Sequence, residues 1–185
     1  MAAKKNGVTW VALLRGINVG GKNPLAMKDL VAKFEAAGCA NVRTYINSGN
    51  VLFSASPTLA KGIPATVSKN IRDKFGLQVP IVLRTADELI ALTKDNPLLE
   101  EGASIDTLFV GFLAEKPTAK AIAALDPSRS PPDHFLIRDR EIFLALPNGA
   151  ARTKLTNAWF DSKLRTVSTM RNWRTVLKLA ELTKP

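Results

Sequence analysis

A glycine-rich loop that ends in a lysine is the part of this sequence closest to a known chemical use. The string Gly16-Ile-Asn-Val-Gly-Gly-Lys-Asn23 nearly spells the phosphate loop G-x-x-x-x-G-K-[ST]. That loop needs glycines whose amides face a phosphate, a lysine that reaches its oxygens and a hydroxyl on magnesium. Asn23 replaces the hydroxyl residue, and Pro24 follows where a helix should already run. A general anion-binding loop is therefore predicted instead of a P-loop NTPase, with Arg15, Asn18, Gly20, Gly21 and Lys22 as its residues. The alternative is a tight strand-to-helix connection that needs glycines for its backbone angles.

Two polar strings near the other end offer a second set of cations. They are Ala151-Arg-Thr-Lys-Leu-Thr-Asn157 and Thr169-Met-Arg-Asn-Trp-Arg-Thr175. A helix beginning near Thr153 would place Lys154, Asn157 and Asp161 on one side. Helix N-termini favour anions, so the predicted binding residues are Arg152, Lys154, Asn157, Arg171 and Asn172. A solvated basic face explains Arg174 and Lys178 equally well.

The net charge is concentrated at the two ends of the chain. Residues 1–50, including Lys4 and Lys5, carry seven Lys and Arg against two acidic residues, a net +5. Residues 150–185 carry eight against two, a net +6, so the middle holds −1 of the total of +10. This pattern suggests one positive field if the fold brings the ends together, and a basic tail with a solvated helix face if it does not.

The residues typical of catalysis do not form a recognisable set. Asn47-Ser-Gly-Asn50 is first of all a turn, and Ser48 has no nearby base in the sequence, although Asn47 and Ser48 are included among the expected anion-binding residues. The single Cys39 cannot form an internal disulfide, and the only histidine, His134, opens a strand-like run. No catalytic residue, metal site or cofactor is predicted.

Hydrophobic spacing predicts the elements that must position these residues. The first half reads as a strand at 8–14, a helix from 27 that Gly38 ends, a hairpin of 42–46 and 51–53, a helix opened by Pro64 and closed by Gly76, a strand at 79–84 and a helix that begins with the capping box Thr85-Ala-Asp-Glu88. The second half reads as a strand at 107–113, a helix at 118–125, a hairpin of 135–138 and 142–146 turning at Asp139-Arg140, a helix at 154–164, a strand at 167–170 and a last helix.

The two halves share this order of elements but little residue identity. The predicted class is α+β: two ferredoxin-like domains (the βαββαβ or α-β plait) in tandem, each followed by an extra helix. The domains would span residues 1–98 and 104–185, with the proline-bearing segment from Asn96 to Ser104 between them. No apolar run approaches the ~20 residues of a membrane span, and the first seven residues do not resemble a signal peptide. A cytoplasmic protein is expected.

Six strings resemble a known bacterial family. They are Leu13-Leu-Arg-Gly-Ile-Asn-Val-Gly-Gly-Lys22, Thr44-Tyr-Ile-Asn-Ser-Gly-Asn50, Val79-Pro-Ile-Val-Leu-Arg-Thr85, Leu146-Pro-Asn-Gly149, Thr153-Lys-Leu-Thr-Asn157 and Thr169-Met-Arg-Asn-Trp173. They are similar to the domain of unknown function 1697, and the resemblance spans almost the whole chain. It implies a pair of α-β plait domains, with no established activity and no catalytic residue to carry over.

The sequence therefore favours a binding protein for a phosphate-bearing ligand or a nucleic-acid backbone. The aromatic signature of RNA-recognition modules is absent, so phosphate contact is expected instead of base reading. One alternative is a small enzyme on a nucleotide or phosphorylated metabolite, with Lys22 or Lys154 stabilising developing charge. Another is a structural module whose two ends form a homodimer interface or a domain seam.

Overall fold

The structure is a computed structural model that describes residues 7–184. Lys4 and Lys5, counted above in the basic N-terminal stretch, lie outside the described part, as do the other residues before Gly7 on which the signal-peptide expectation rests. The backbone contacts divide the chain into two compact units. Among the described residues, one unit is Gly7–Leu89 together with Leu182–Lys184, and the other is Ile90–Glu181.

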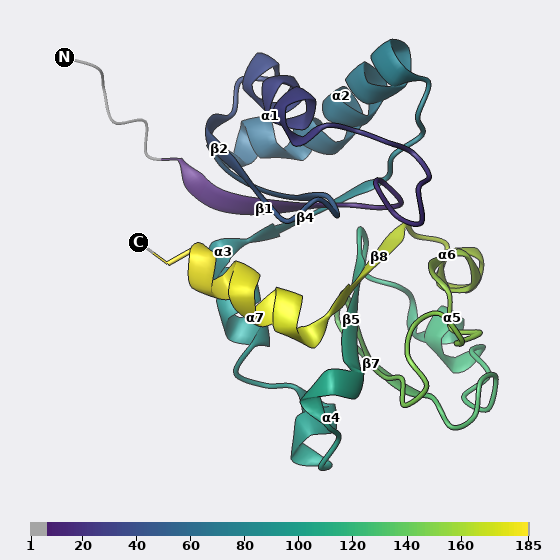
Figure 1. Cartoon of the computed structure of the whole chain (residues 1–185). Coiled ribbons are helices and arrows are strands. Elements are labelled where there is room, and N and C mark those ends of the chain that lie inside the picture. Colours follow the sequence, from purple (N-terminus) through teal and green to yellow (C-terminus); the bar gives the residue numbers. More distant parts are fainter. Residues whose placement is uncertain (1–6, 185) are drawn as a thin grey trace. The chain divides into compact units, whose positions relative to one another are not determined.

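The first unit is an antiparallel sheet covered on one face by two helices (Figure 1). Its elements are β1 (Val8–Leu14), α1 (Met27–Ala36), β2 (Ala40–Tyr45), β3 (Asn50–Ala55), α2 (Pro57–Phe75), β4 (Ile81–Thr85) and α3 (Ala86–Leu92), which runs on into the second unit. The strand order is β2-β3-β1-β4. The central strand β3 is buried at five of its six residues and β1 at its last four, as expected for their apolar, β-branched composition.

Side chains at helical spacing fill the space between this sheet and its helices. Leu30 and Phe34 of α1 are buried, and the Phe34 ring lies 5.3 Å from that of Phe53 on β3. Helix α2 contributes Ile63, Val67 and Ile71, spaced by four residues along one face. The amphipathic helices expected here are therefore present, with their apolar faces on the sheet.

The predicted start of α3 is confirmed and that of α2 is not. The capping box is confirmed, because the Thr85 amide donates to Glu88 Oε2 at 2.7 Å and the Glu88 amide to Thr85 Oγ1 at 3.1 Å. The expectation that Pro64 opens a helix is wrong, since α2 begins at Pro57 and Pro64 lies inside it. Ser56 caps α2 by accepting from the Leu59 amide at 3.2 Å, so the Ser-Pro pair sets the start.

The second unit repeats this arrangement. After the short helices α4 (Pro97–Glu100) and η1 (Ile105–Thr107) come β5 (Leu108–Leu113), α5 (Ala119–Ala123), β6 (His134–Arg138), β7 (Glu141–Ala145), α6 (Asn157–Leu164), β8 (Ser168–Asn172) and α7 (Trp173–Leu182), whose last residue groups with the first unit. The sheet order is β6-β7-β5-β8, again antiparallel, with α5 and α6 on one face (Figure 1). Trp159 and Phe160 of α6 form an edge-to-face aromatic cluster with Phe135 of β6. The predicted α+β class is confirmed at the level of two four-stranded antiparallel sheets with helices.

Equivalent backbone hydrogen bonds occur at matching positions in the two sheets. The last residue of β1, Leu14, donates to the Gly49 carbonyl at 2.8 Å, and the last residue of β5, Leu113, donates to the Arg140 carbonyl at 2.9 Å. The residue after each strand bonds the start of the fourth strand: Arg15 to Pro80 at 3.0 Å, and Ala114 to Val167 at 2.8 Å. The halves therefore repeat in register as well as in element order.

A buried arginine also recurs in this register. Arg84 on β4 lies opposite Val11, and Arg171 on β8 lies opposite Val110. Arg84 is 1% exposed and Arg171 9%. In each half the next residue caps the following helix, as Thr85 does for α3 and Asn172 does for α7.

Candidate functional site

The glycine-rich loop after β1 is held in place by the side chain of Asn18. Its amide nitrogen donates to the Leu25 carbonyl at 2.8 Å and to the Asn47 carbonyl at 2.9 Å. Its oxygen accepts from the Leu25 amide at 2.8 Å. The fold thus brings together Asn18 and Asn47, two of the predicted site residues. The side-chain amide of Asn18 bonds backbone groups of the loop and so has a structural role.

The tip of this loop is an exposed tight turn. The Lys22 amide donates to the Val19 carbonyl at 3.0 Å, and Gly20 and Gly21 between them have φ of 58° and 73°. Asn23 Nδ2 donates back to the Gly16 carbonyl at 2.7 Å. Glycine is needed at the tip for its backbone angles, and the exposed lysine follows a turn, not a helix start, since α1 begins only at Met27. This geometry agrees with the sequence evidence against a P-loop.

The turn between β2 and β3 packs against the same loop. Gly49 has φ of 84° and is buried against Leu14 and Ile17. The half-buried Ser48 hydroxyl accepts from Asn50 Nδ2 at 3.2 Å, and the same Nδ2 donates to the Tyr45 carbonyl at 3.1 Å. Ser48 is therefore part of a turn network, as its turn-forming neighbours predicted.

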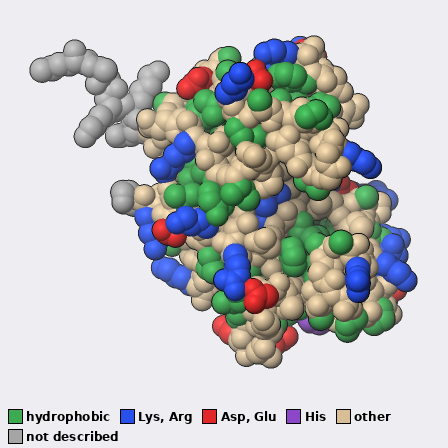
Figure 2. Space-filling view, in the orientation of Figure 1, with side chains coloured by type: hydrophobic (Ala, Val, Ile, Leu, Met, Phe, Trp, Pro, Cys, Tyr) green, Lys and Arg blue, Asp and Glu red, His purple; other side chains and the backbone are tan. Residues whose placement is uncertain are grey.

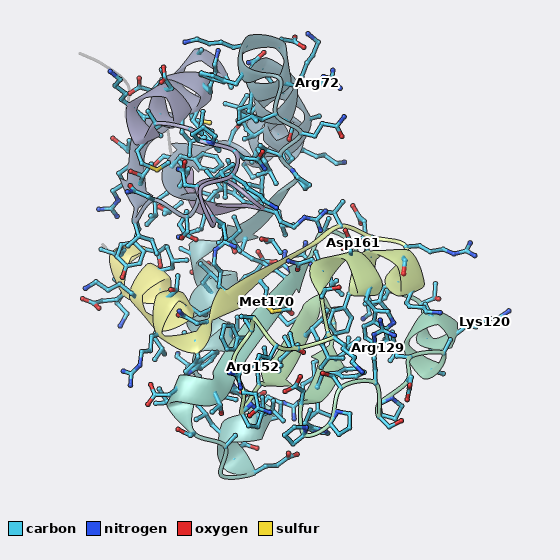
Figure 3. All side chains as sticks on the ribbon, turned by 45° about the vertical axis from the view of Figure 1, so that its right-hand side comes forward. Arg72, Lys120, Arg129, Arg152, Asp161 and Met170 are labelled. Carbon is cyan, nitrogen blue, oxygen red and sulfur yellow. The ribbon has the colours of Figure 1, made fainter. Side chains whose placement is uncertain are left out.

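The cations of the first C-terminal string lie in a loop that is tied to a neighbouring loop. The Lys154 amide donates to Ser130 Oγ, and Arg129 Nε donates to the Lys154 carbonyl, both at 3.0 Å. The side chains of Arg152 and Lys154 are exposed, and Figure 3 shows Arg152 and Arg129 on this part of the second unit. Arg129 stacks over Trp159, with its guanidinium carbon 4.8 Å from the ring centroid.

The helix that follows starts later than expected. Thr156 caps α6 by accepting from the Trp159 amide at 3.2 Å, so the helix begins at Asn157. The expectation of a helix from residue 154 is therefore wrong, because the Thr156 hydroxyl is the cap and Lys154 precedes it. Asn157 Oδ1 and Asp161 Oδ1 both accept from Ser168 Oγ, at 3.1 and 2.7 Å, which joins α6 to β8.

The second C-terminal string has structural bonds. Arg171 Nη1 donates to Thr169 Oγ1 at 2.9 Å and to the Met170 carbonyl at 2.8 Å. Burial lowers the pKa of the Arg171 guanidinium to about 10, so the side chain is still a cation at neutral pH. Asn172 Oδ1 accepts from the Thr175 amide at 2.8 Å and so begins α7.

Charge pairing separates the cations of the basic strings into two groups. Arg174 bonds Asp106 at 2.7 Å, and Lys178 bonds Glu181 at 2.9 Å. In contrast, the exposed side chains of Lys22, Arg152 and Lys154 have no ion pair with any described residue. Arg129 was missed by sequence reasoning, since its stacking partner is thirty residues away in the chain.

The groups suited to other chemistry are separated or buried. Cys39 is 7% exposed, and burial raises the pKa of its thiol to about 11. Such a thiol is a poor nucleophile at neutral pH. Within residues 7–184, no three His, Cys, Asp or Glu side chains come together as a metal site. None of the helices in the described part of the chain is long and apolar enough to cross a membrane.

Comparisons with known proteins agree with this architecture. The model of the family described as "Protein of unknown function (DUF1697)" matches residues 8–143. A solved structure of a conserved bacterial protein from Streptococcus pneumoniae is similar at a TM-score of 0.71 and 20% identity, over 96% of this chain and 99% of that one. At this identity the likeness concerns the fold. No curated protein matches the sequence.

Proposed function

Starting from the fact that the chain belongs to the DUF1697 family of proteins of unknown function, we propose that it binds a phosphate-bearing ligand or the backbone of a nucleic acid. Each unit would contribute its own polar, basic segments to this binding. In the first unit these are Arg15 and the loop tip with Lys22, and in the second unit they are Arg152 and Lys154 of one string and Arg171 and Asn172 of the other.

One observation carries this proposal. Exposed cations that already have a carboxylate partner gain less from an anionic ligand, because the partner must be displaced. Lys22, Arg152 and Lys154 have no such partner among the described residues, and the whole chain carries a net charge of +10. Unpaired cations on a basic protein attract phosphate groups over long range at low ionic strength.

We further infer that each unit is a ferredoxin-like plait and that the protein acts in the cytoplasm. The strand orders β2-β3-β1-β4 and β6-β7-β5-β8, antiparallel throughout, support the first inference, since they fit a βαββαβ chain whose hairpin strands pair at one side. A single cysteine that is buried and free supports the second.

Fluorescence polarisation with a labelled single-stranded oligonucleotide, measured across a salt series, tests the proposal. Binding should weaken as salt rises, with a logarithmic slope of about −0.7 for each phosphate contact. The triple variant K22Q/R152Q/K154Q should bind more weakly and with a shallower slope. K69Q is the matched control for each single charge removed, since Lys69 is exposed but paired with Asp73 at 2.5 Å.

Two results would contradict the proposal. One is an absence of binding to the oligonucleotide, to ATP and to inorganic phosphate at low salt. The other is that the single variants K22Q, R152Q and K154Q each weaken binding no more than K69Q does, because net charge alone would then account for the binding. Turnover of ATP in the same titration would instead show that the site performs a reaction as well as binding.

A further inference from the structure

Each half of the molecule has a groove at the same place in its fold. The groove lies between the loop that follows the first strand, the helix after that loop, and the C-terminal end of the second helix. In the first half it measures about 650 Å³ and is lined by Asn18, Pro24, Leu25, Ala26, Met27, Asp29, Asn47 and Phe75. In the second half it measures about 500 Å³ and is lined by Glu115, Lys116, Pro117, Thr118, Lys120, Ala121, Ala124, Lys163, Leu164, Arg165 and Thr166.

The two grooves differ sharply in charge. The lining of the first has one charged residue, Asp29, which is paired with Lys74 at 3.4 Å. The lining of the second has four cations against the single carboxylate of Glu115. These cations come from three segments, namely the loop after β5, helix α5 and the end of α6. Figure 2 shows Lys and Arg side chains gathered over α5 and α6, and Figure 3 shows Lys120 extending from α5 away from the sheet.

Three of the four cations are available for a ligand. Lys116 is paired with Asp139 at 2.9 Å. The side chains of Lys120, Lys163 and Arg165 are exposed, and none of them forms an ion pair with another residue in the part of the chain that the structure describes. Three like charges around one groove repel one another, and an anion bound between them would relieve that repulsion.

The backbone at Arg165 gives a second, independent indication. Helices α2 and α6 both end on a left-handed residue whose amide bonds the carbonyl four residues back: Gly76 to Arg72 at 2.8 Å, and Arg165 to Asp161 at 2.9 Å. The first half places glycine at this position, where φ is 69°. The second half has an arginine at this position, with φ of 56°, although the left-handed backbone conformation is unfavourable for a residue that has a Cβ. A residue that is strained where glycine would fit suggests a role for its side chain.

We propose that the groove of the second half binds a small phosphate-bearing molecule of nucleotide size. Lys120, Lys163 and Arg165 would contact the phosphate oxygens, and the partly exposed Ala121 and the exposed Ala124 offer an apolar surface to the rest of the ligand. A groove of this volume suits a small molecule. None of these residues belongs to the surface proposed above, so the two sites can be tested separately.

Isothermal titration with ADP, inorganic pyrophosphate and adenosine tests this site. ADP should bind more tightly than pyrophosphate, and adenosine should not bind measurably. The double variant K120Q/K163Q and the single variant R165G should each weaken ADP binding by about tenfold or more, as loss of a charge-assisted hydrogen bond implies. R165G should fold well, since Gly76 occupies the matching position, and its melting temperature verifies this.

The control is K178Q, which removes a partly exposed, paired cation of the same unit and should leave ADP affinity unchanged. The proposal is overturned if ADP gives no binding, if R165G binds ADP as tightly as the parent, or if K178Q weakens ADP binding as much as R165G does. If adenosine binds as tightly as ADP, the cations do not contribute to binding. If pyrophosphate binds as tightly as ADP, the apolar surface does not contribute to binding.

Discussion

Replacing Gly49 by alanine should lower the free energy of unfolding by about 3 kcal/mol, from two separate costs. The residue has φ of 84°, a conformation that costs an L side chain about 1–2 kcal/mol. A Cβ at this position would also lie 2.8 Å from Leu14 Cβ and 3.1 Å from Ile17 Cδ1. Forcing an extra methyl group into such a packed place costs about 1–3 kcal/mol more.

Gly76→Ala separates the two costs. Gly76 has φ of 69°, but a Cβ there would have no atom within 4 Å. Only the backbone cost applies, so the loss should be about 1 kcal/mol. Urea denaturation followed by tryptophan fluorescence and circular dichroism measures both variants, which lie in the same unit. Equal losses for the two variants would refute the argument, because the close contacts with Leu14 and Ile17 would then contribute nothing.

Three further predictions concern local structure and one thiol. Thr85→Ala should lower the free energy of unfolding by about 1 kcal/mol in urea, since it removes the hydroxyl that accepts the Glu88 amide. A loss no larger than that of Thr58→Ala, at an exposed threonine that is not the cap of its helix, would contradict this role. Asn18→Ala should speed amide hydrogen exchange at Leu25, whose amide loses its acceptor, while exchange in β3 stays unchanged. Cys39 should resist Ellman's reagent at pH 8 until the protein unfolds. Because the pKa of the buried thiol is raised to about 11, the thiol of the unfolded chain ionises first. The contribution of the protonated thiol to the free energy of unfolding should therefore be complete below pH ~9 and lost as the pH rises through about 11. A Cys39→Ala variant should lack that alkaline loss, and an identical pH profile for the two proteins would contradict the assignment.

Elements with strong local signals were predictable from the sequence. The capping box at Thr85 and the hairpin turn at Asp139-Arg140 need only a few neighbouring residues, and both are confirmed. The predicted starts of α2 and α6 were wrong because more than one residue near each start could begin a helix. Helix α2 begins at the Ser56-Pro57 pair and not at Pro64, and α6 begins after the Thr156 cap and not at the residues just before it.

The candidate site was less predictable, because its contacts join residues that are distant in sequence. Asn18 reads as a loop residue that could bind a ligand, but its bonds to Leu25 and Asn47 appear only in the folded chain. The pairing of Arg174 with Asp106 spans 68 residues. The basic groove of the second half was missed because two of its cations, Lys116 and Lys120, lie in the middle of the chain, where the net charge is close to zero.

The buried arginines at matching positions in the two halves have a consequence for folding specificity. A guanidinium keeps its charge at any physiological pH, so Arg84 and Arg171 cannot become neutral to suit an apolar interior. A loosely collapsed chain that lost the native acceptors of these side chains, the Leu83 and Met170 carbonyls among them, would bury a poorly compensated charge, at a cost of several kcal/mol. Each half therefore penalises its own molten, partly packed states, and its sheet should melt cooperatively.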